Sequence, residues 1–319
     1  MATLRTIRLR IKGTKNIKQI TRAMEAVSAV KMRKSQGVAL SARPYATAAL
    51  KLLRSVQSGA PEGIVVFSPL LEKREGAPKA EGGRVRNVLL VVVTSDKGLA
   101  GSFNANVLKK AEIFIKSVTG TVSVATVGKK AGDYFVRRGR TPVVALTGYG
   151  DYAEISEVQP IFDAVVEAFI AKKADEVYVI YTNFLSAMKQ EVVIRKLLPF
   201  SEEGLQEMVK GIVPERGKFA DVTVQNGVND VNAREYIFEP SPKEIFDSIL
   251  PALLKIEIYH AILEANASEH SSRMVAMRSA TDNATELIKA YTVTMNKARQ
   301  SAINKELAEI TGGSEALNS

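Results

Sequence analysis

Apolar residues near the start of the chain recur at the spacing of a coiled-coil seam. They lie three and four positions apart, and this spacing is interrupted near Gly13 before it continues. The residues are Leu4, Ile7, Ile11, Ile17, Ile20, Met24 and Val27. A stripe this narrow fits one partner helix. We therefore expect one long helix over residues 4–58, which Pro44 should kink and the turn-forming residues 58–61 should end.

A longer and stricter seam lies in the C-terminal part of the chain. Its 4-3 spacing continues over seven heptads, through Ile249, Leu253, Ile256, His260, Leu263, Ala267, His270, Met274, Met277, Thr281, Ala284, Ile288, Tyr291, Met295, Ala298 and Ala302. A straight helix would drift off such a seam by about 20° per heptad, so the spacing predicts a left-handed supercoil. The helix should cover residues 242–311 and stop at Gly312-Gly313.

The middle of the chain alternates between strand-like and helix-like segments. Strands are predicted at Val88–Thr94, Val122–Val127, Pro142–Leu146, Glu176–Tyr181 and Gln190–Leu197, and helices at Asn106–Ser117, Lys129–Arg138 and Pro160–Lys173. Such alternation, with apolar and β-branched strands, is typical of a mostly parallel α/β sandwich. Residues 59–86 are interpreted as a loop, and residues 201–241 as a linker or an insertion.

Together these segments predict an α/β fold with an inserted domain. The terminal helices, residues 1–58 and 242–319, should pair as a long antiparallel left-handed coiled coil, because they are the two ends of one chain. The inserted domain, residues 87–200, should be Rossmann-like with mostly parallel strands. The C-terminal helix is the longer one, so part of it should be a single helix. Its seam should be enclosed by something else, because an apolar seam is unfavourable in water.

Charge is concentrated in the first of these helices. The chain of 319 residues has a net charge of +10, yet residues 1–58 hold thirteen basic residues against one acid, Glu25. The other 261 residues hold 31 bases and 33 acids. Such a basic arm could neutralise nucleic-acid phosphates, although no aromatic residue precedes Tyr45 to stack on bases. Because the same helix has an apolar seam, we interpret the charge as a face presented to an acidic protein surface.

Composition excludes several kinds of site and of membrane attachment. The chain has no cysteine, which excludes disulfides, thiolate metal sites and Cys nucleophiles. His260 and His270, the two histidines, would lie about 80° and some 15 Å apart on a helix, so they cannot share a metal. The longest aliphatic run, Val88–Val93, is far shorter than the roughly 20 residues of a membrane helix. The charged N-terminus is unlike a secretory signal and leaves a mitochondrial transit peptide open.

The residues show no catalytic motif. Gly98-Leu99-Ala100-Gly101-Ser102 follows a strand and precedes a helix, a place where a phosphate could bind. It matches neither glycine-rich nucleotide motif, so we interpret it as a tight turn, with a nucleotide-dependent α/β enzyme as the alternative. The sequence has no Ser/His/Asp set, no HExxH and no paired carboxylates at a strand end. We therefore expect no catalytic residue, no cofactor and no metal.

Motifs at both ends of the chain point to one family. They are Ile7–Lys12, Thr14–Glu25 and Val27–Lys34 at the start, Ser95–Gly101 in the middle, and Ala267–Met277, Ala280–Ala284, Asn296–Ile303 and Glu306–Ile310 at the end. Over nearly the whole chain, these segments resemble the γ subunit family of F-type ATP synthases. The match begins by residue 7, which leaves no room for a transit peptide and favours a bacterial-type protein.

Two features depart from the family pattern. Ala100 stands where many members have cysteine, and residues 201–241 are longer than in short members. Chloroplast members have a redox-active cysteine pair near this place. A chain without cysteine cannot operate that switch.

The resemblance implies a central rotary shaft that is not itself an enzyme. The coiled coil would enter the α3β3 ring, and the α/β domain would be a foot bound to the ε subunit and the membrane c-ring. Proton flow would turn ring and shaft together and drive the β-subunit nucleotide sites between states of different affinity, for ATP synthesis or hydrolysis. The chain would be peripheral, on the cytoplasmic face of the bacterial inner membrane, with no nucleic-acid partner and no direct membrane span.

The resemblance also suggests which residues contact partners. Stator-facing or helix-locking contacts are expected at Met24, Lys31, Arg33, Lys34, Arg273, Lys297, Arg299 and Gln300. The small and apolar end of the second helix suits a close-fitting bearing, formed by Ala298, Ala302, Ile303, Leu307 and Ile310. None of these residues is expected to be catalytic.

Overall fold

The computed structural model describes residues 4–41, 69–72, 74, 77–78, 84–150, 154–200 and 242–318. The chain divides into two compact units, one of residues 1–29 and 273–319 and the other of residues 30–272. Both long helices therefore contribute to both units. The domain boundaries proposed from the sequence stay a prediction.

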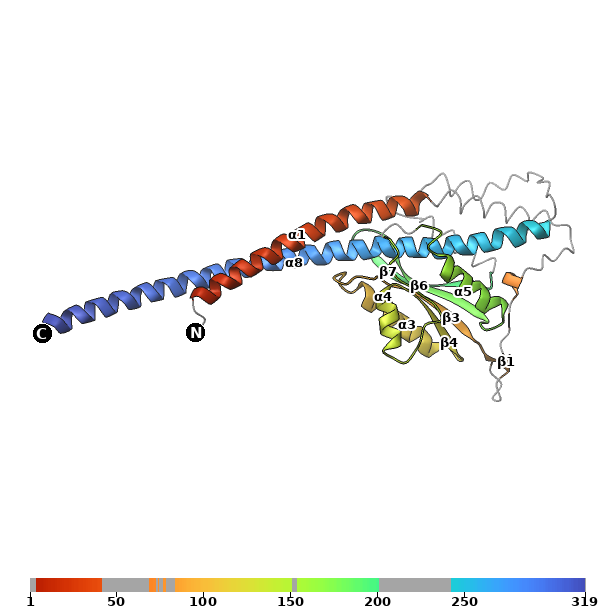
Figure 1. The fold of residues 1–319 in the computed structure, drawn as a ribbon, viewed down its shortest axis with the longest axis horizontal. Helices are drawn as coiled ribbons and strands as arrows, with labels where there is room; N and C mark the ends of the chain where they lie inside the picture. The colour runs from red at the N-terminus through yellow and green to blue at the C-terminus, as the bar shows by residue number, and fades with distance from the viewer. Residues whose placement is uncertain are drawn as a thin grey trace. The chain divides into compact units, whose positions relative to one another are not determined.

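The helices and strands follow one another as Figure 1 shows. In chain order they are α1 (Leu4–Ser41), the 3-10 helix η1 (Pro69–Leu71), β1 (Ala77–Pro78), β2 (Arg84–Val85), β3 (Val88–Val93), α3 (Phe103–Ser117), β4 (Val122–Val127), α4 (Lys129–Val136), β5 (Ala145–Leu146), α5 (Gln159–Ile170), β6 (Glu176–Phe184), β7 (Gln190–Leu198) and α8 (Pro242–Asn318). The predicted loop at residues 59–86 thus contains η1 and the short antiparallel pair β1–β2.

The second unit is built on a five-stranded sheet with the order β5-β4-β3-β6-β7. β3 pairs in parallel with β4 and with β6, and β4 pairs in parallel with β5. β7 is antiparallel to β6, because a tight hairpin joins them through two backbone hydrogen bonds between Ser186 and Lys189. The predicted α/β domain of mostly parallel strands is confirmed.

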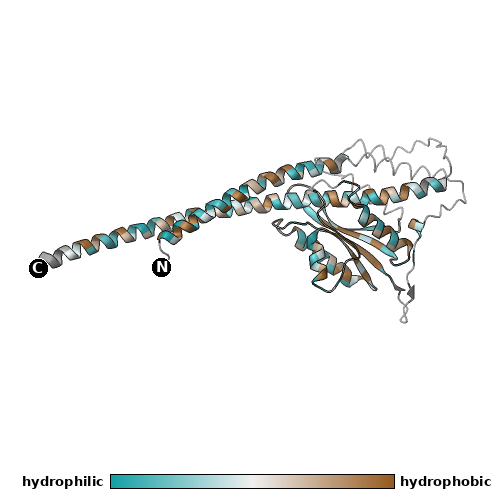
Figure 2. Cartoon of the chain, viewed as in Figure 1, coloured by the Kyte–Doolittle hydropathy of each residue, from teal (hydrophilic) through white to brown (hydrophobic). Residues whose placement is uncertain are grey.

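Helices cover both faces of this sheet. On one face, Leu90 and Val92 of β3 pack with apolar residues of α3 and α4. On the other, Leu89 and Val91 pack with residues of α5 and of the first half of α8. All six residues of β3 are buried, as expected for a strand covered on both sides. Figure 2 shows the resulting band of apolar strands.

α8 is buried on two faces within the second unit. One face packs into the core beneath the sheet, through Leu250, Leu254, Ile258, Ile262 and Ala265. The predicted seam forms the other face, and its members Ile256, His260, Leu263, Ala267 and His270 are also buried. The seam stays a prediction in this half of α8, because every residue from His260 to Ser271 is buried. The sheet-facing side was missed, because its residues fall between the heptad positions.

The first unit is an antiparallel pair of helices. Thr21 Oγ1 lies 2.7 Å from Thr281 Oγ1, and Glu25 Oε1 lies 3.9 Å from Arg278 Nε. Advancing along α1 from Thr21 to Glu25 thus means going back along α8 from Thr281 to Arg278. The predicted antiparallel pairing is confirmed. On α8 the seam positions from Met274 to Ala298 are buried or half-buried, as the 4-3 spacing predicts.

On α1 the predicted seam is wrong beyond Gly13. The predicted members Ile17, Ile20 and Val27 are 55%, 58% and 54% exposed. The helix passes through Gly13 without a break, so the 4-3 period set by Ile7 keeps its phase. The less exposed positions are polar, namely Thr14, Lys18, Thr21, Glu25 and Ser28. Hydroxyls are tolerated there because they are hydrogen-bonded, as Thr21 is to the carbonyl of Lys18.

The predicted end of α8 is also wrong. The helix continues through Gly312 and Gly313 to Asn318. A glycine ends a helix by adopting the left-handed conformation, and neither residue has a φ in that range. The predicted helix at 42–58, the kink at Pro44 and the insertion at 201–241 lie outside the described residues.

Candidate functional site

The exposed apolar residues of α1 form a stripe beside the seam. Ile17, Ile20, Met24 and Val27 are spaced three, four and three apart, so they lie on one side of the helix, roughly 110° from the seam. Three of them are more than half exposed, and Met24 is half-buried. We call these four residues the apolar flank. All four were predicted as seam residues, and the interruption of the spacing near Gly13 was the one sign in the sequence of their real position.

Basic residues form a second stripe on the opposite side of the seam. Arg8, Lys12, Lys15 and Arg22 are all exposed and lie roughly 100° from the seam in the other direction. We call these four residues the basic flank. The acid of the same segment, Glu25, is half-buried and paired with Arg278 on α8, so it does not neutralise the basic flank. Between residues 12 and 27, α1 is thus apolar on one side of the seam and positively charged on the other.

The predicted partner contacts on α8 fall into two groups within the first unit. Arg273 is only 7% exposed and engaged in contacts of its own, which fits a helix-locking residue. Lys297, Arg299 and Gln300 are exposed near the end of the seam. Their role as contacts to partners stays a prediction.

From Ser301 to Gly313, no other described segment covers α8. All residues from Ser301 to Gly313 are exposed, as expected for the single-helix part. Ile303, Leu307 and Ile310 are 48%, 55% and 63% exposed and share one face, because they are spaced four and three apart. This apolar tip has the composition expected of a bearing surface.

The remaining predicted contacts belong to the other unit. Lys31 is half-buried, and Arg33 and Lys34 are exposed. Lys31 and Lys34 make contacts within the chain, whereas Arg33 is on the side of α1 that the basic flank occupies. Lys31 lies one heptad after Met24 on the same side of α1, whereas Arg33 and Lys34 lie on other sides of the helix.

At the carboxyl edge of the sheet, Asp96 joins three loops. It follows β3, and its Oδ1 accepts a hydrogen bond of 2.7 Å from the backbone N–H of Lys129, the first residue of α4. Its Oδ2 accepts one of 2.8 Å from the N–H of Gly148, after β5. Ligands of doubly wound folds bind at this edge, and helix N-termini bind anions. Here the carboxylate of Asp96 itself takes the anion position at α4.

The glycine-containing segment after β3 is held by its own side chains. The N–H of Ser95 donates to Asn104 Oδ1 at 3.0 Å, and Asn104 Nδ2 donates to Ser95 Oγ at 2.8 Å. Leu99 and Gly101 have φ values of +64° and +57°, so the chain reverses sharply there. These features support the interpretation of Gly98–Ser102 as a tight turn.

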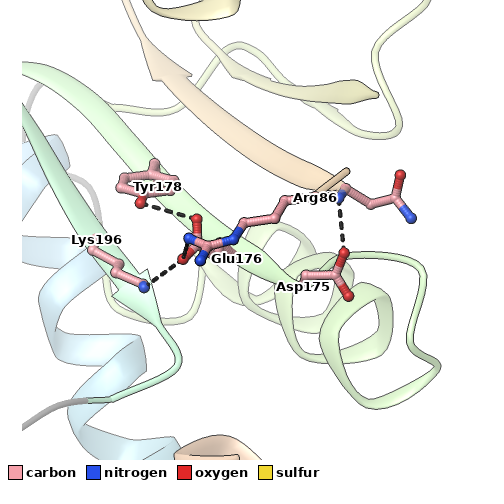
Figure 3. A network of polar contacts seen from close by, with 6 residues as sticks. Arg86, Asp175, Glu176, Tyr178 and Lys196 are labelled. Atoms are coloured by element: carbon pink, nitrogen blue, oxygen red, sulfur yellow. Dashed lines mark hydrogen bonds and ion pairs between the residues drawn. The ribbon is translucent and has the colours of Figure 1, made fainter. Parts of the chain in front are cut away.

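At the amino edge of the sheet, Glu176 connects the ends of three strands (Figure 3). Its Oε1 accepts from Arg86 at 2.9 Å and from Lys196 at 2.7 Å, and its Oε2 accepts from Tyr178 at 3.1 Å. Burial alone would raise the pKa of Glu176, but the hydrogen bond and charge of Lys196 and the charge of Arg86 lower it overall. Burial and the Glu176 charge raise the pKa of Tyr178 to about 12. Both carboxylate oxygens of Glu176 are hydrogen-bonded, and these contacts hold the strand ends together.

Neither edge offers a metal centre. Among the residues that the structure describes, no group of three or more His, Asp or Glu side chains is arranged to hold a metal ion. In the same part of the chain, no helix has both the length and the apolar character needed to cross a bilayer.

Comparison with known proteins gives matches over the whole chain. The sequence profile of a family described as ATP synthase matches residues 3–317. An ATP synthase gamma chain of Chloroflexus aurantiacus is 39% identical over 322 residues, covering 100% of both chains. One of Pelotomaculum thermopropionicum is 39% identical over 319 residues, covering 99% of this chain and 100% of the relative.

A solved structure has a similar fold. The match is to the rotor of the mitochondrial ATP synthase of Euglena gracilis in rotational state 1, with a TM-score of 0.58 and 18% sequence identity. It covers 94% of this chain and 98% of that chain. Terminal helices with an inserted α/β domain are thus an architecture already seen in a solved structure.

Proposed function

Because the chain belongs to the family of ATP synthase gamma chains, we propose that it is the central rotary shaft of an F-type ATP synthase. In this role it couples proton flow through the membrane c-ring to conformational cycling of the β-subunit nucleotide sites. It is not itself catalytic. The similarity to gamma chains over their whole length supports this role for the entire chain.

The asymmetry of α1 is the structural observation that carries the proposal. The apolar flank and the basic flank lie on opposite sides of the seam, so a ring around this helix meets different chemistry in different directions. A partner shifts an equilibrium between two states only if it contacts the two states with different free energy. A shaft with one apolar and one charged side supplies that difference at each angle of rotation.

The two flanks act on different features of the ring. The exposed lysines and arginines of the basic flank attract acidic segments of the β subunits, and this contact can break and re-form because both groups stay near water. The apolar flank instead favours whichever β-subunit conformation offers an apolar surface. Met24 lies on the apolar flank, and Arg33 lies near the basic flank, in the neighbouring part of α1.

The remaining contacts follow from the same role. The exposed apolar tip formed by Ile303, Leu307 and Ile310 is enclosed by the α3β3 ring, where it acts as a bearing, with Lys297, Arg299 and Gln300 just before it. The α/β domain is the foot that binds the ε subunit and the c-ring. The chain is peripheral, on the cytoplasmic face of the bacterial inner membrane.

Reconstitution tests this function. The purified chain is mixed with α and β subunits and added to vesicles that contain the membrane sector. We expect the chain alone to hydrolyse no ATP, to co-purify with α and β, and to restore proton-driven ATP synthesis. ATP hydrolysis by the chain alone, or a failure to associate with α and β, would contradict the proposal.

A further inference from the structure

Three serines of α8 bind the last two strands of the foot sheet. Ser268 Oγ donates a hydrogen bond of 3.0 Å to the carbonyl of Thr182 in β6. Ser271 Oγ donates one of 2.7 Å to the carbonyl of Ala187 in the hairpin after β6. Ser272 Oγ donates one of 2.9 Å to Oε1 of Gln190, the first residue of β7. One row of hydroxyls thus reaches β6, the hairpin and β7.

Gln190 completes this set of contacts. Its Nε2 donates to Ser271 Oγ at 3.1 Å and to the carbonyl of Ala187 at 3.1 Å. The amide therefore uses both its oxygen and its nitrogen to join the hairpin to two successive serines of α8. We call Ser268, Ser271, Ser272 and Gln190 the serine clamp.

The clamp is buried. Ser268 and Ser271 are both 0% exposed, and Gln190 and Ser272 are half-buried. Serine is a poorer helix former than alanine, and a buried hydroxyl costs free energy unless it is hydrogen-bonded. Three serines within five helical positions are therefore not explained by helix formation. Their spacing of three and four places all of them on one side of α8.

These three hydrogen bonds constrain the rotation of α8 relative to the two strands and their hairpin. Further towards its N-terminus, α8 meets the sheet through apolar residues such as Ile258, Ile262 and Ala265. Apolar contact is non-directional, whereas a hydrogen bond needs a defined distance and angle. Turning the helix by one residue, about 100°, would remove all three hydroxyls from their acceptors and leave buried polar groups without partners.

We propose that the serine clamp fixes the angle of α8 about its own axis relative to the foot sheet, and that it thereby transmits torque between foot and shaft. The proposal rests on the function proposed above. It assigns Ser268, Ser271, Ser272 and Gln190 as positioning residues for rotary coupling. α8 continues from Ser272 to Asn318 as one helix, so an angle set at the clamp is passed on along it.

The angular stiffness of the foot tests the clamp. The chain has no cysteine, so Lys109→Cys on the exposed side of α3 gives a single attachment point for a bead. The shaft is held in a nucleotide-locked α3β3 ring, and the angular distribution of the bead is recorded. We expect Gln190→Leu with Ser271→Ala to broaden this distribution by at least half. Ser272→Ala, at a half-buried position, should broaden the angular distribution less. This single variant replaces the double variant in the experiment if the double variant does not fold.

The matched control is Tyr178→Phe, which removes a part-buried hydrogen bond of the foot that does not involve α8. It should lower the melting temperature slightly and leave the angular width unchanged. If the serine clamp only stabilises the hairpin, its variants will have lower melting temperatures but the same angular width of the bead as the parent chain. This result would overturn the proposal. If the parent chain itself does not enter the ring, the proposed function has failed, and the two failures are thus distinguishable.

Discussion

Glu257 is a carboxyl group that the fold keeps away from water. It is 5% exposed, and its Oε2 has no hydrogen-bond partner among the described residues. Burial raises its pKa from 4.5 to about 8, against the charge of Arg195, which lowers it. In the folded protein the carboxyl group is therefore mostly neutral at neutral pH.

This raised pKa predicts a loss of stability as the pH increases. Between pH 4.5 and pH 8 the folded state holds a proton that the unfolded state has released. The free energy of unfolding therefore falls with rising pH, with a slope of up to about 1.4 kcal/mol per pH unit, and the loss ends above the folded pKa. Glu257→Gln removes the ionisable group, so we expect it to be more stable than the parent at pH 8 by roughly 4 kcal/mol.

Urea unfolding at pH 5 and pH 8 measures this effect. The advantage of Glu257→Gln should be small at pH 5 and large at pH 8. Glu167→Gln is the control, because Glu167 is exposed and pairs with Lys173 at the surface. Equal pH dependence in Glu257→Gln and the parent would show that Glu257 is ionised in the folded protein.

At the scale of elements, the strands were predictable because their apolar runs are short and bounded by turns. β4 lies at the predicted residues, and β3 and β7 end within one residue of the predicted ends. β5 is shorter than predicted, with two residues paired to β4. Apolar β-branched runs determine where strands form, whereas the pairing partner determines where they end.

The surface of α1 was not predictable from apolar period alone. Ile17, Ile20 and Val27 have helical spacing. The polar residues of the observed seam, from Thr14 to Ser28, have the same spacing. The pattern favoured the apolar set because a seam in an isolated helix pair is apolar. Between Thr14 and Ser28 the structure shows the opposite, with polar side chains in the seam and aliphatic side chains exposed beside it. An exposed aliphatic stripe is the signature of a further partner, and sequence periodicity cannot distinguish it from a seam.

Charge reversal on the basic flank tests the two-sided helix. Lys12→Glu with Lys15→Glu changes two exposed side chains, so folding should be unaffected. We expect weaker association with α3β3, by about 1 kcal/mol for the pair of charges, and slower coupled ATP synthesis.

The matched control is Lys109→Glu with Lys116→Glu, two exposed lysines of α3 in the foot. It makes the same change in net charge away from the coiled coil. Association with α3β3 should be measured at low and high salt, because screening reduces a charge contact. If both double variants bind equally well, the basic flank is not the surface that meets the ring.

At the scale of the whole molecule, both long helices run through the two units. α8 is buried against the sheet in the unit of residues 30–272 and forms the antiparallel pair in the other unit. The fold class could be predicted from sequence, because the seam of α8 and the strand alternation are strong patterns. The hydrogen bonds between α8 and the last two strands could not, since serines in a helix give no periodic signal. The role of those serines becomes visible only in the structure, where they donate hydrogen bonds to β6, β7 and their hairpin.

The central claim is that this chain turns as a shaft inside an α3β3 ring. The most direct measurement fixes the ring to a surface, attaches a bead to Lys109→Cys in the foot and supplies ATP. We predict rotation in one direction with three pauses in each turn, one for each β subunit. A bead that stays fixed, or that only fluctuates in both directions while ATP is being hydrolysed, would contradict the claim.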